Sequence, residues 1–218
     1  MPRFTAARSE LADPYPQAVV FERGDRHFAV ASGGGGGAAQ LLPADLLGRI
    51  LDTAWRSAAA AWSDEDHLLA FIDAAHAGVV ELRRDPVWLG TTAHLAAAWW
   101  DPARSCVWAS GVGRAEVYAV QGGEPSVVHR ETTLPGTDLV VAALGMCEPP
   151  ARPRRIDVAP GDRIVLASHA QLAGEAFVAV LREVHEPSAL WHVLRERAAS
   201  TPQFDRRAVI GVVEPRSL

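Results

Sequence analysis

Two short patterns in this sequence combine residue types that catalyse reactions or bind ligands. Ser168-His169 places a hydroxyl beside an imidazole, the pairing with which many hydrolases activate a nucleophile. Neighbouring residues at the end of a strand point in different directions, however, and the sequence contains no G-x-S-x-G elbow. We therefore do not interpret this pair as a catalytic nucleophile.

The glycine tract Gly33 to Gly37 is the second pattern, and with Ala38 it satisfies the dinucleotide-binding fingerprint G-x-G-x-x-A. Consecutive glycines match any glycine motif, and no P-loop lysine follows them. The acidic residue expected after a second strand is also missing, because Asp52 falls inside a predicted helix. A flexible loop that closes a helix N-terminus is the preferred interpretation, and a nucleotide-binding domain is kept as an alternative.

Histidine and cysteine spacings offer no metal-binding pair. His67 and His76 lie nine residues apart on a predicted helix, which separates them by well over a right angle around its axis. Cys106 and Cys147 are the only cysteines, and neither has a C-x-x-C or Cys/His spacing. We expect both cysteines to be reduced and structural.

The composition bounds the class of protein. The chain has 218 residues, of which 49% are hydrophobic and 22% charged, as expected for one domain spanning residues 1–218. The formal net charge is −5 and the basic residues are scattered, so nucleic acid is not an expected partner. No run of about 18 apolar residues occurs, so we expect no membrane partner and a cytoplasmic location.

The elements that must position any site are grouped in blocks. Apolar residues recur at helical spacing over residues 43–62 and 64–82, and turn residues separate Val-, Ala- and Trp-rich strands in the middle of the chain. Separate blocks of helices and strands predict an α+β fold and not a doubly wound sheet. The predicted strands are residues 18–21, 27–31, 93–100, 106–110, 116–120, 126–129, 139–143, 164–167 and 208–213, and two further helices are predicted at 171–184 and 188–199.

Seven short segments follow one another in an order that a known family shares. They are residues 8–13 (RSELAD, similar to R-x-x-N-[EQ]-D), 27–36 (HFAVASGGGG, similar to F-A-V-A-D-G-M-G-G), 89–92 (LGTT, similar to M-G-T-T), 111–115 (GVGRA, similar to G-D-S-R-A), 144–145 (LG, similar to part of A-L-G), 160–169 (PGDRIVLASH, similar to P-G-D-R-[IL]-L-L-x-S-D) and 204–209 (FDRRAV, similar to D-D-N-[IA]-T-V). From end to end, this order resembles the type 2C (PPM-type) family of metal-dependent serine/threonine protein phosphatases.

The resemblance implies a four-layer α-β-β-α sandwich with a two-metal site at one end. In that family, carboxylates hold two Mg²⁺ or Mn²⁺ ions that activate the attacking water, and an arginine near the N-terminus binds the phosphate. Two divalent cations side by side need several carboxylates to offset their mutual repulsion. The acidic positions of the family are therefore the ones that decide whether this chemistry is possible.

This sequence departs from the family at those acidic positions. The replaced positions are Ala12, Ser32 (for the bridging Asp), Val112 (for the Asp of G-D-S-R) and His169 (for the Asp of S-D-G). The positions that match are Arg8 for phosphate binding, with Asp13, Asp205 and the backbone carbonyl of Gly33 for metal. Because most of the negative charge is missing, no cofactor is expected. If the site is retained, a single Mn²⁺ or Mg²⁺ would lie between Asp13, Asp205 and His169.

Our first hypothesis is a pseudophosphatase, which binds a phosphoprotein, a kinase or another regulatory protein without two-metal hydrolysis. The competing hypothesis is an active metal-dependent phosphatase with a remodelled site, in which His169 serves as a softer ligand that favours Mn²⁺ or Zn²⁺. Some of the matching residues also have a structural interpretation, with Asp205 paired to a neighbouring arginine and Arg8 as an ordinary surface residue.

Overall fold

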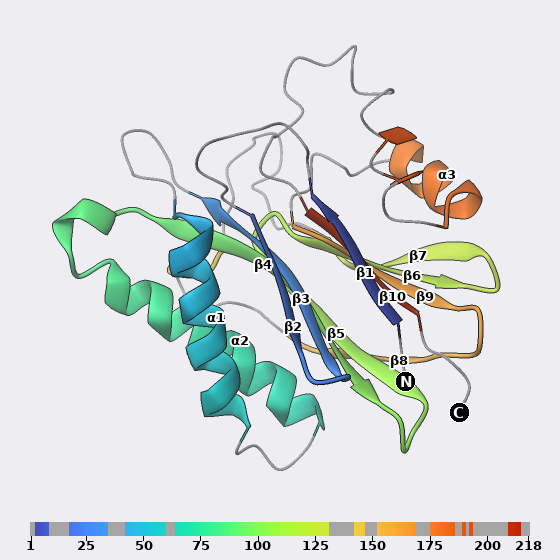
Figure 1. Ribbon diagram of the computed structural model, residues 1–218, viewed down its shortest axis with the longest axis horizontal. Helices are drawn as coiled ribbons and strands as arrows, with labels where there is room; N and C mark the ends of the chain where they lie inside the picture. Colours follow the sequence, from blue (N-terminus) through green and yellow to red (C-terminus); the bar gives the residue numbers. More distant parts are fainter. Residues whose placement is uncertain are drawn as a thin grey trace.

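The computed structural model shows two five-stranded sheets that face each other, with helices on both outer faces (Figure 1). This is the four-layer α-β-β-α arrangement that the resemblance implied. The residues that the structure describes are 3–8, 18–34, 42–59, 64–130, 142–146, 152–168, 175–185, 189–190, 192–193 and 209–214.

The strands of both sheets pair in antiparallel fashion throughout the described residues. In one sheet the order is β2 (Ala18–Arg23), β3 (His27–Gly34), β4 (Thr92–Asp101), β5 (Cys106–Val112) and β8 (Arg154–Asp157). In the other it is β1 (Arg3–Arg8), β10 (Val209–Glu214), β9 (Arg163–Ala167), β6 (Glu116–Gln121) and β7 (Glu124–His129). A dinucleotide-binding fingerprint binds its ligand at the turn between strand and helix in a parallel strand–helix–strand unit. The antiparallel pairing of β3 therefore argues against that interpretation of the glycine tract.

Helices α1 (Ala44–Ala58) and α2 (Asp64–Leu82) cover the sheet that contains β3, and α3 (Glu175–Glu183) covers the other sheet (Figure 1). A short 3₁₀ helix, η1 (Pro86–Trp88), connects α2 to β4. None of the described helices is both long and apolar enough to cross a membrane. In α1 the buried residues recur every three or four positions, as the helical period requires, and they are Leu47, Leu51, Ala54 and Ala58.

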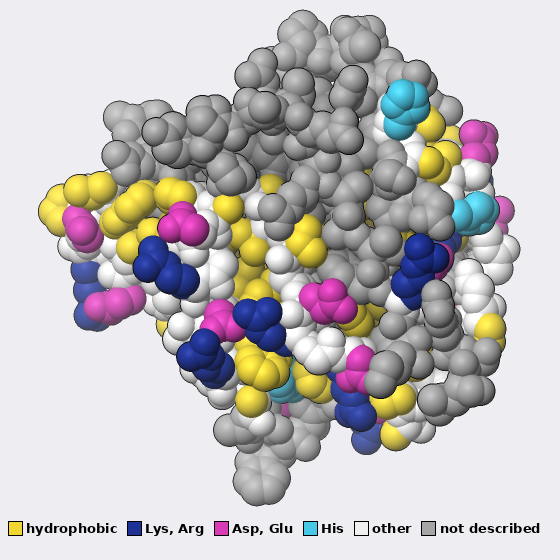
Figure 2. All heavy atoms as spheres, in the orientation of Figure 1, with side chains coloured by type: hydrophobic (Ala, Val, Ile, Leu, Met, Phe, Trp, Pro, Cys, Tyr) yellow, Lys and Arg dark blue, Asp and Glu magenta, His cyan; other side chains and the backbone are white. Residues whose placement is uncertain are grey.

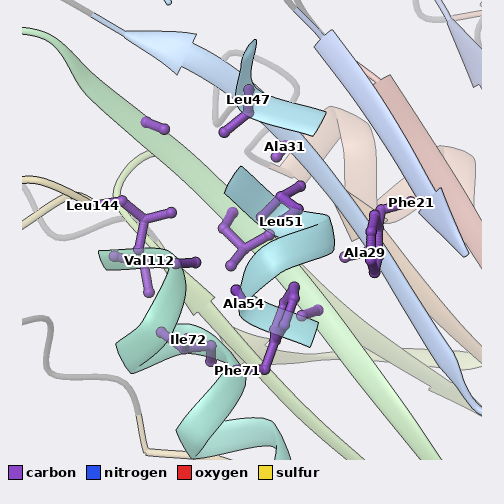
Figure 3. Close-up of a cluster of buried hydrophobic side chains, with 14 of the residues drawn as sticks. Phe21, Ala29, Ala31, Leu47, Leu51, Ala54, Phe71, Ile72, Val112 and Leu144 are labelled. Atoms are coloured by element: carbon purple, nitrogen blue, oxygen red, sulfur yellow. The ribbon is translucent and has the colours of Figure 1, made fainter. Parts of the chain in front are cut away.

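Three layers of buried apolar side chains hold the sandwich together. One lies between α1, α2 and their sheet and includes Phe21, Leu51 and Phe71 (Figure 3). The second, between the sheets, includes Phe28 and Val30, and the third, under α3, includes Phe177. Successive residues of a strand point to opposite faces, so each inner strand contributes alternate residues to two of these layers. Val30 and Ala31, for example, belong to different layers.

Most of the predicted elements are present with shifted ends, and α2 has the predicted bounds. Strands β1 and β8 were not predicted, because their short sequences, RFTAAR and RRID, contain few strand-forming residues and pairing with β10 and β5 stabilises them. The predicted strand 139–143 falls partly outside the described residues. Its described part, residues 142–143, is not a strand, and the next residue, Leu144, forms an isolated bridge with Ala93. The predicted helix 188–199 also lies largely outside the described residues.

Candidate functional site

The ends of β3 and β9 meet at one end of the sandwich, although they belong to different sheets. Ser32, in β3, donates a hydrogen bond from its hydroxyl to the backbone carbonyl of Ser168 over 3.0 Å. Both residues are fully buried, and they lie 136 positions apart in the sequence. The contact holds the residue at the bridging-Asp position against the residue immediately before His169.

Strand pairing brings Arg8 to the same end of the sandwich. Arg8, the last residue of β1, lies opposite Val209 of β10. β10 pairs in turn with β9, which ends at Ala167. Asp205 lies four residues before β10 and His169 two residues after β9. The topology therefore places the end of β1, the start of β10 and the end of β9 side by side, whereas Asp205 and His169 themselves lie outside the described residues.

The predicted site is described only in part. Ser32, Gly33 and Val112 are described completely, and Arg8 is described as part of the backbone of β1. Among the residues that the structure describes, no group of three or more His, Cys, Asp or Glu side chains is arranged to hold a metal ion. Ala12, Asp13, His169 and Asp205 lie outside the described residues, so their roles remain predictions.

The first two glycines of the tract belong to β3 and have packing roles. A Cβ on Gly33 would overlap the backbone carbonyl of Leu42, which precedes α1. A Cβ on Gly34 would lie 2.7 Å from the Thr92 hydroxyl and 2.8 Å from Nε2 of His94. Only glycine allows these close approaches, so these two residues serve the connection between β3, α1 and β4.

His94 is a site residue that the sequence did not indicate. It lies directly opposite Ser32 in the pairing of β3 with β4, and its side chain is buried. Its Nδ1 accepts a hydrogen bond from the backbone N–H of Arg114 over 3.2 Å. A Cβ on Gly113, which has φ of 77°, would overlap the same ring nitrogen. The imidazole thus occupies the space beside the G-V-G-R turn, where the family pattern has serine in place of Gly113. A single histidine in an apolar strand gives no spacing signal.

Val112 lies on the opposite face of the sheet from Ser32. It pairs with Leu95 in β4, one residue beyond His94, and adjacent residues of a strand point to opposite faces. Val112 is 2% exposed and packs in the layer beneath the helices, beside Leu144 (Figure 3). The acidic position of G-D-S-R is therefore part of the apolar core in this protein.

Glu116 does not replace the missing carboxylates. It is fully buried on β6 and accepts a hydrogen bond from the Tyr118 hydroxyl. Burial and the neighbouring carboxylate raise the pKa of Tyr118. Tyr118 belongs to the layer under α3, and Glu116, two residues earlier in the strand, shares that face. Ser32 instead points between the sheets, toward Ser168.

The P-G-D-R segment at the start of β9 has a structural role. The Asp162 carboxylate accepts hydrogen bonds from the backbone N–H groups of Ala159 at 2.8 Å and Gly122 at 3.0 Å. The Arg163 guanidinium donates hydrogen bonds to the backbone carbonyls of Leu181 and Val184 at the end of α3, each with a length of 3.0 Å. Burial lowers the pKa of Arg163. These contacts fix β9 and so position Ser168.

The described part of this site does not fit a pair of divalent cations. Such ions take oxygen ligands, mainly carboxylates. Ser32 offers a neutral hydroxyl whose proton is already donated, and Val112 offers no polar atom. The Gly33 carbonyl is the one matching ligand position that is fully described. What the arrangement can do is hold two sheets together around a buried polar contact at the end of the sandwich.

No protein-family model matches this sequence, and no curated protein matches it either. Solved structures do match its fold. The Mycobacterium tuberculosis serine/threonine phosphatase PstP/Ppp has a TM-score of 0.74 at 17% identity, with 99% of each chain covered. The catalytic domain of PstP in complex with two manganese ions has a TM-score of 0.73 at 19% identity, covering 97% of this chain and 96% of that one. PppA of Pseudomonas aeruginosa, described as a key regulatory component of T6SS, has a TM-score of 0.73 at 17% identity, covering 98% of this chain and 97% of that one. The chain therefore has the fold of the type 2C serine/threonine phosphatases.

Proposed function

We propose that this protein is a pseudophosphatase, a type 2C phosphatase fold that binds a phosphoprotein, a kinase or another regulatory protein without two-metal hydrolysis. The observation that carries the proposal is the buried hydrogen bond from the Ser32 hydroxyl to the Ser168 carbonyl. At this position the family resemblance calls for the Asp that bridges both metals. Here the same position makes a neutral contact between the two sheets.

The charge balance supports the loss of the metal pair. Two dications about 4 Å apart repel each other by about 16 kcal/mol at an effective dielectric constant of about 20. Several carboxylates must offset this repulsion, and four of the family's acidic positions hold Ala, Ser, Val and His in this sequence. Asp13 and Asp205 alone leave the pair of ions uncompensated. A single ion held by these two residues and His169 would not support a reaction that needs two metal ions.

The matching arginine supports phosphate binding. Arg8 ends β1 next to the start of β10, at the end of the sandwich where Ser32 meets Ser168. A guanidinium group there would recognise a phosphoryl group through paired N–H donors, and this needs no metal. We infer that the partner presents a phosphoserine or phosphothreonine to this end of the protein in the cytoplasm.

Three measurements on the purified protein test this proposal. Calorimetric titration with Mn²⁺ and an aryl phosphate assay should show no binding of two ions per chain and no metal-dependent turnover. A phosphoserine peptide should bind, and Arg8→Gln should lower the affinity for this peptide about tenfold or more. Arg3→Gln on the same strand is the matched control, because Arg3 is partly exposed and lies near Glu214 at the far end of β1.

The remodelled phosphatase is the competing outcome of the same assays. It would show turnover with Mn²⁺ or Zn²⁺ that Asp205→Ala and His169→Ala both abolish. Such turnover would overturn the pseudophosphatase proposal. Stabilisation by NAD or ATP, which the antiparallel strands around the glycine tract argue against, would instead support the nucleotide-binding alternative.

A further inference from the structure

A polar cavity lies on the side of the sandwich where the edge strands of the two sheets come together. β7 is the edge of one sheet and β8 the edge of the other. Between them is a cavity of about 470 Å³, which is within the usual size of ligand pockets. Its described lining residues are Ala109, Ser110, Val128, His129, Arg130, Arg152 and Arg154. Neither Ser32 nor Gly33 belongs to this lining.

Three arginines make the cavity cationic. Arg130 follows β7, and Arg152 and Arg154 lie two residues apart at the start of β8, where an extended chain turns alternate side chains to the same side. Within the described part of the chain, none of the three forms an ion pair or a hydrogen bond through its side chain. The described lining includes no acidic residue to offset them.

Several other arginines of the protein are paired with acidic residues. On the face shown in Figure 2, basic side chains lie among acidic ones and form no separate patch. Arg155, adjacent to Arg154, pairs with Asp157 at 2.8 Å, and Arg182 pairs with Glu124 at 3.0 Å. Arg130, Arg152 and Arg154, by contrast, line one cavity and have no acidic partner among the described residues.

His129 forms part of the cavity wall. Its ring packs so closely on Gly111 that a Cβ there would overlap it. Its Nε2 is buried and has no hydrogen-bond partner among the described residues. Burial and the nearby Arg154 lower the pKa of His129 to about 4, so the ring is neutral at physiological pH. An anion in the cavity would give the guanidinium groups acidic partners, which they do not have among the described residues.

We propose that this cavity, lined by His129, Arg130, Arg152 and Arg154, is a binding site for a phosphoryl group. A planar guanidinium group binds two phosphate oxygens at once. Two or three such groups around one cavity match the double negative charge of a phosphoryl group better than the single charge of a carboxylate ligand. The cavity is large enough to take the phosphoryl group together with the part of the molecule that carries it. Binding here does not depend on the proposed role of Arg8.

Calorimetric titration tests this site with three probes: a phosphoserine peptide, the same peptide without phosphate, and inorganic phosphate. Arg154→Gln should weaken binding of the phosphorylated probes about 10- to 100-fold, since it removes charge-assisted hydrogen bonds. Arg155→Gln is the matched control, because it removes the same charge from the next residue, which is paired with Asp157. We expect it to change the affinity less than twofold.

The peptide and inorganic phosphate distinguish two sources of the ligand. Tighter binding of the phosphopeptide assigns the cavity to a phosphorylated protein, and equal binding assigns it to a small phosphate compound. On binding, the imidazole resonances of His129 should shift in an NMR titration. Equal effects of Arg154→Gln and Arg155→Gln would overturn the proposal, and so would binding that only Arg8→Gln weakens, which would support the Arg8 site instead.

Discussion

Replacing Ser32 by Asp puts back the acidic side chain of the family and should destabilise the protein. The Ser32 side chain is fully buried and donates to the Ser168 carbonyl over 3.0 Å, whereas a carboxylate cannot donate. Burial against a carbonyl oxygen should raise the pKa of the new carboxyl from about 4 to about 7, and a rise of this size costs about 4 kcal/mol of unfolding free energy at pH 7 and above.

Urea unfolding at pH 7.5 and at pH 5 measures this cost against a control of the same size. Ser32→Asn fills the same space without charge, and its amide can donate to the Ser168 carbonyl. The difference between the Asp and Asn variants should be about 4 kcal/mol at pH 7.5 and should shrink as the pH falls and the carboxyl takes up a proton. Equal stability of the two variants at pH 7.5 would refute the reasoning, because it would mean that the position tolerates a charge.

Three further predictions concern the surroundings of the site and the core. Val112→Asp should lower the unfolding free energy by about 3–5 kcal/mol, since it places a charge in the apolar layer beneath the helices; a loss below 1 kcal/mol in urea unfolding would contradict this placement. Arg163→Gln should cost about 2–3 kcal/mol through its two lost carbonyl contacts, against less than 1 kcal/mol for exposed Arg182→Gln. Burial lowers the pKa of His27 to about 3, so the unfolded chain takes up the proton first, and this residue should contribute a loss of about 2 kcal/mol of unfolding free energy between pH 7.5 and pH 5. His27→Phe should remove this contribution and the same change at exposed His185 should not; unchanged pH dependence of stability in His27→Phe would show that His27 is not responsible.

The fold was predictable from the sequence where periodicity is strong. Helix α2 has the predicted bounds, and the β4 strand appears within two residues of its predicted ends. Strand β8 was missed because its sequence, Arg154–Asp157, is almost entirely charged and forms a strand only by pairing with the edge of β5. Long-range pairing of this kind leaves no local signal.

The site was predictable only where the family pattern could be matched. The resemblance selected Ser32 and Gly33, but their contacts could not be read from it, because Ser168 is 136 residues from Ser32 and packing brings them together. His94 gave no signal, since a lone histidine in an apolar strand has no spacing that points to a role. The glycine tract was ambiguous in the sequence, and the close approach of Gly33 to Leu42 explains part of it.

The most direct test of the missing metal pair is a crystal structure grown with excess Mn²⁺, with anomalous diffraction recorded at the manganese absorption edge. We expect no pair of anomalous peaks beside Ser32, and the Ser32 hydroxyl should remain bonded to the Ser168 carbonyl. Two manganese ions bridged by solvent between Ser32 and His169 would contradict the proposed loss of metal-dependent hydrolysis.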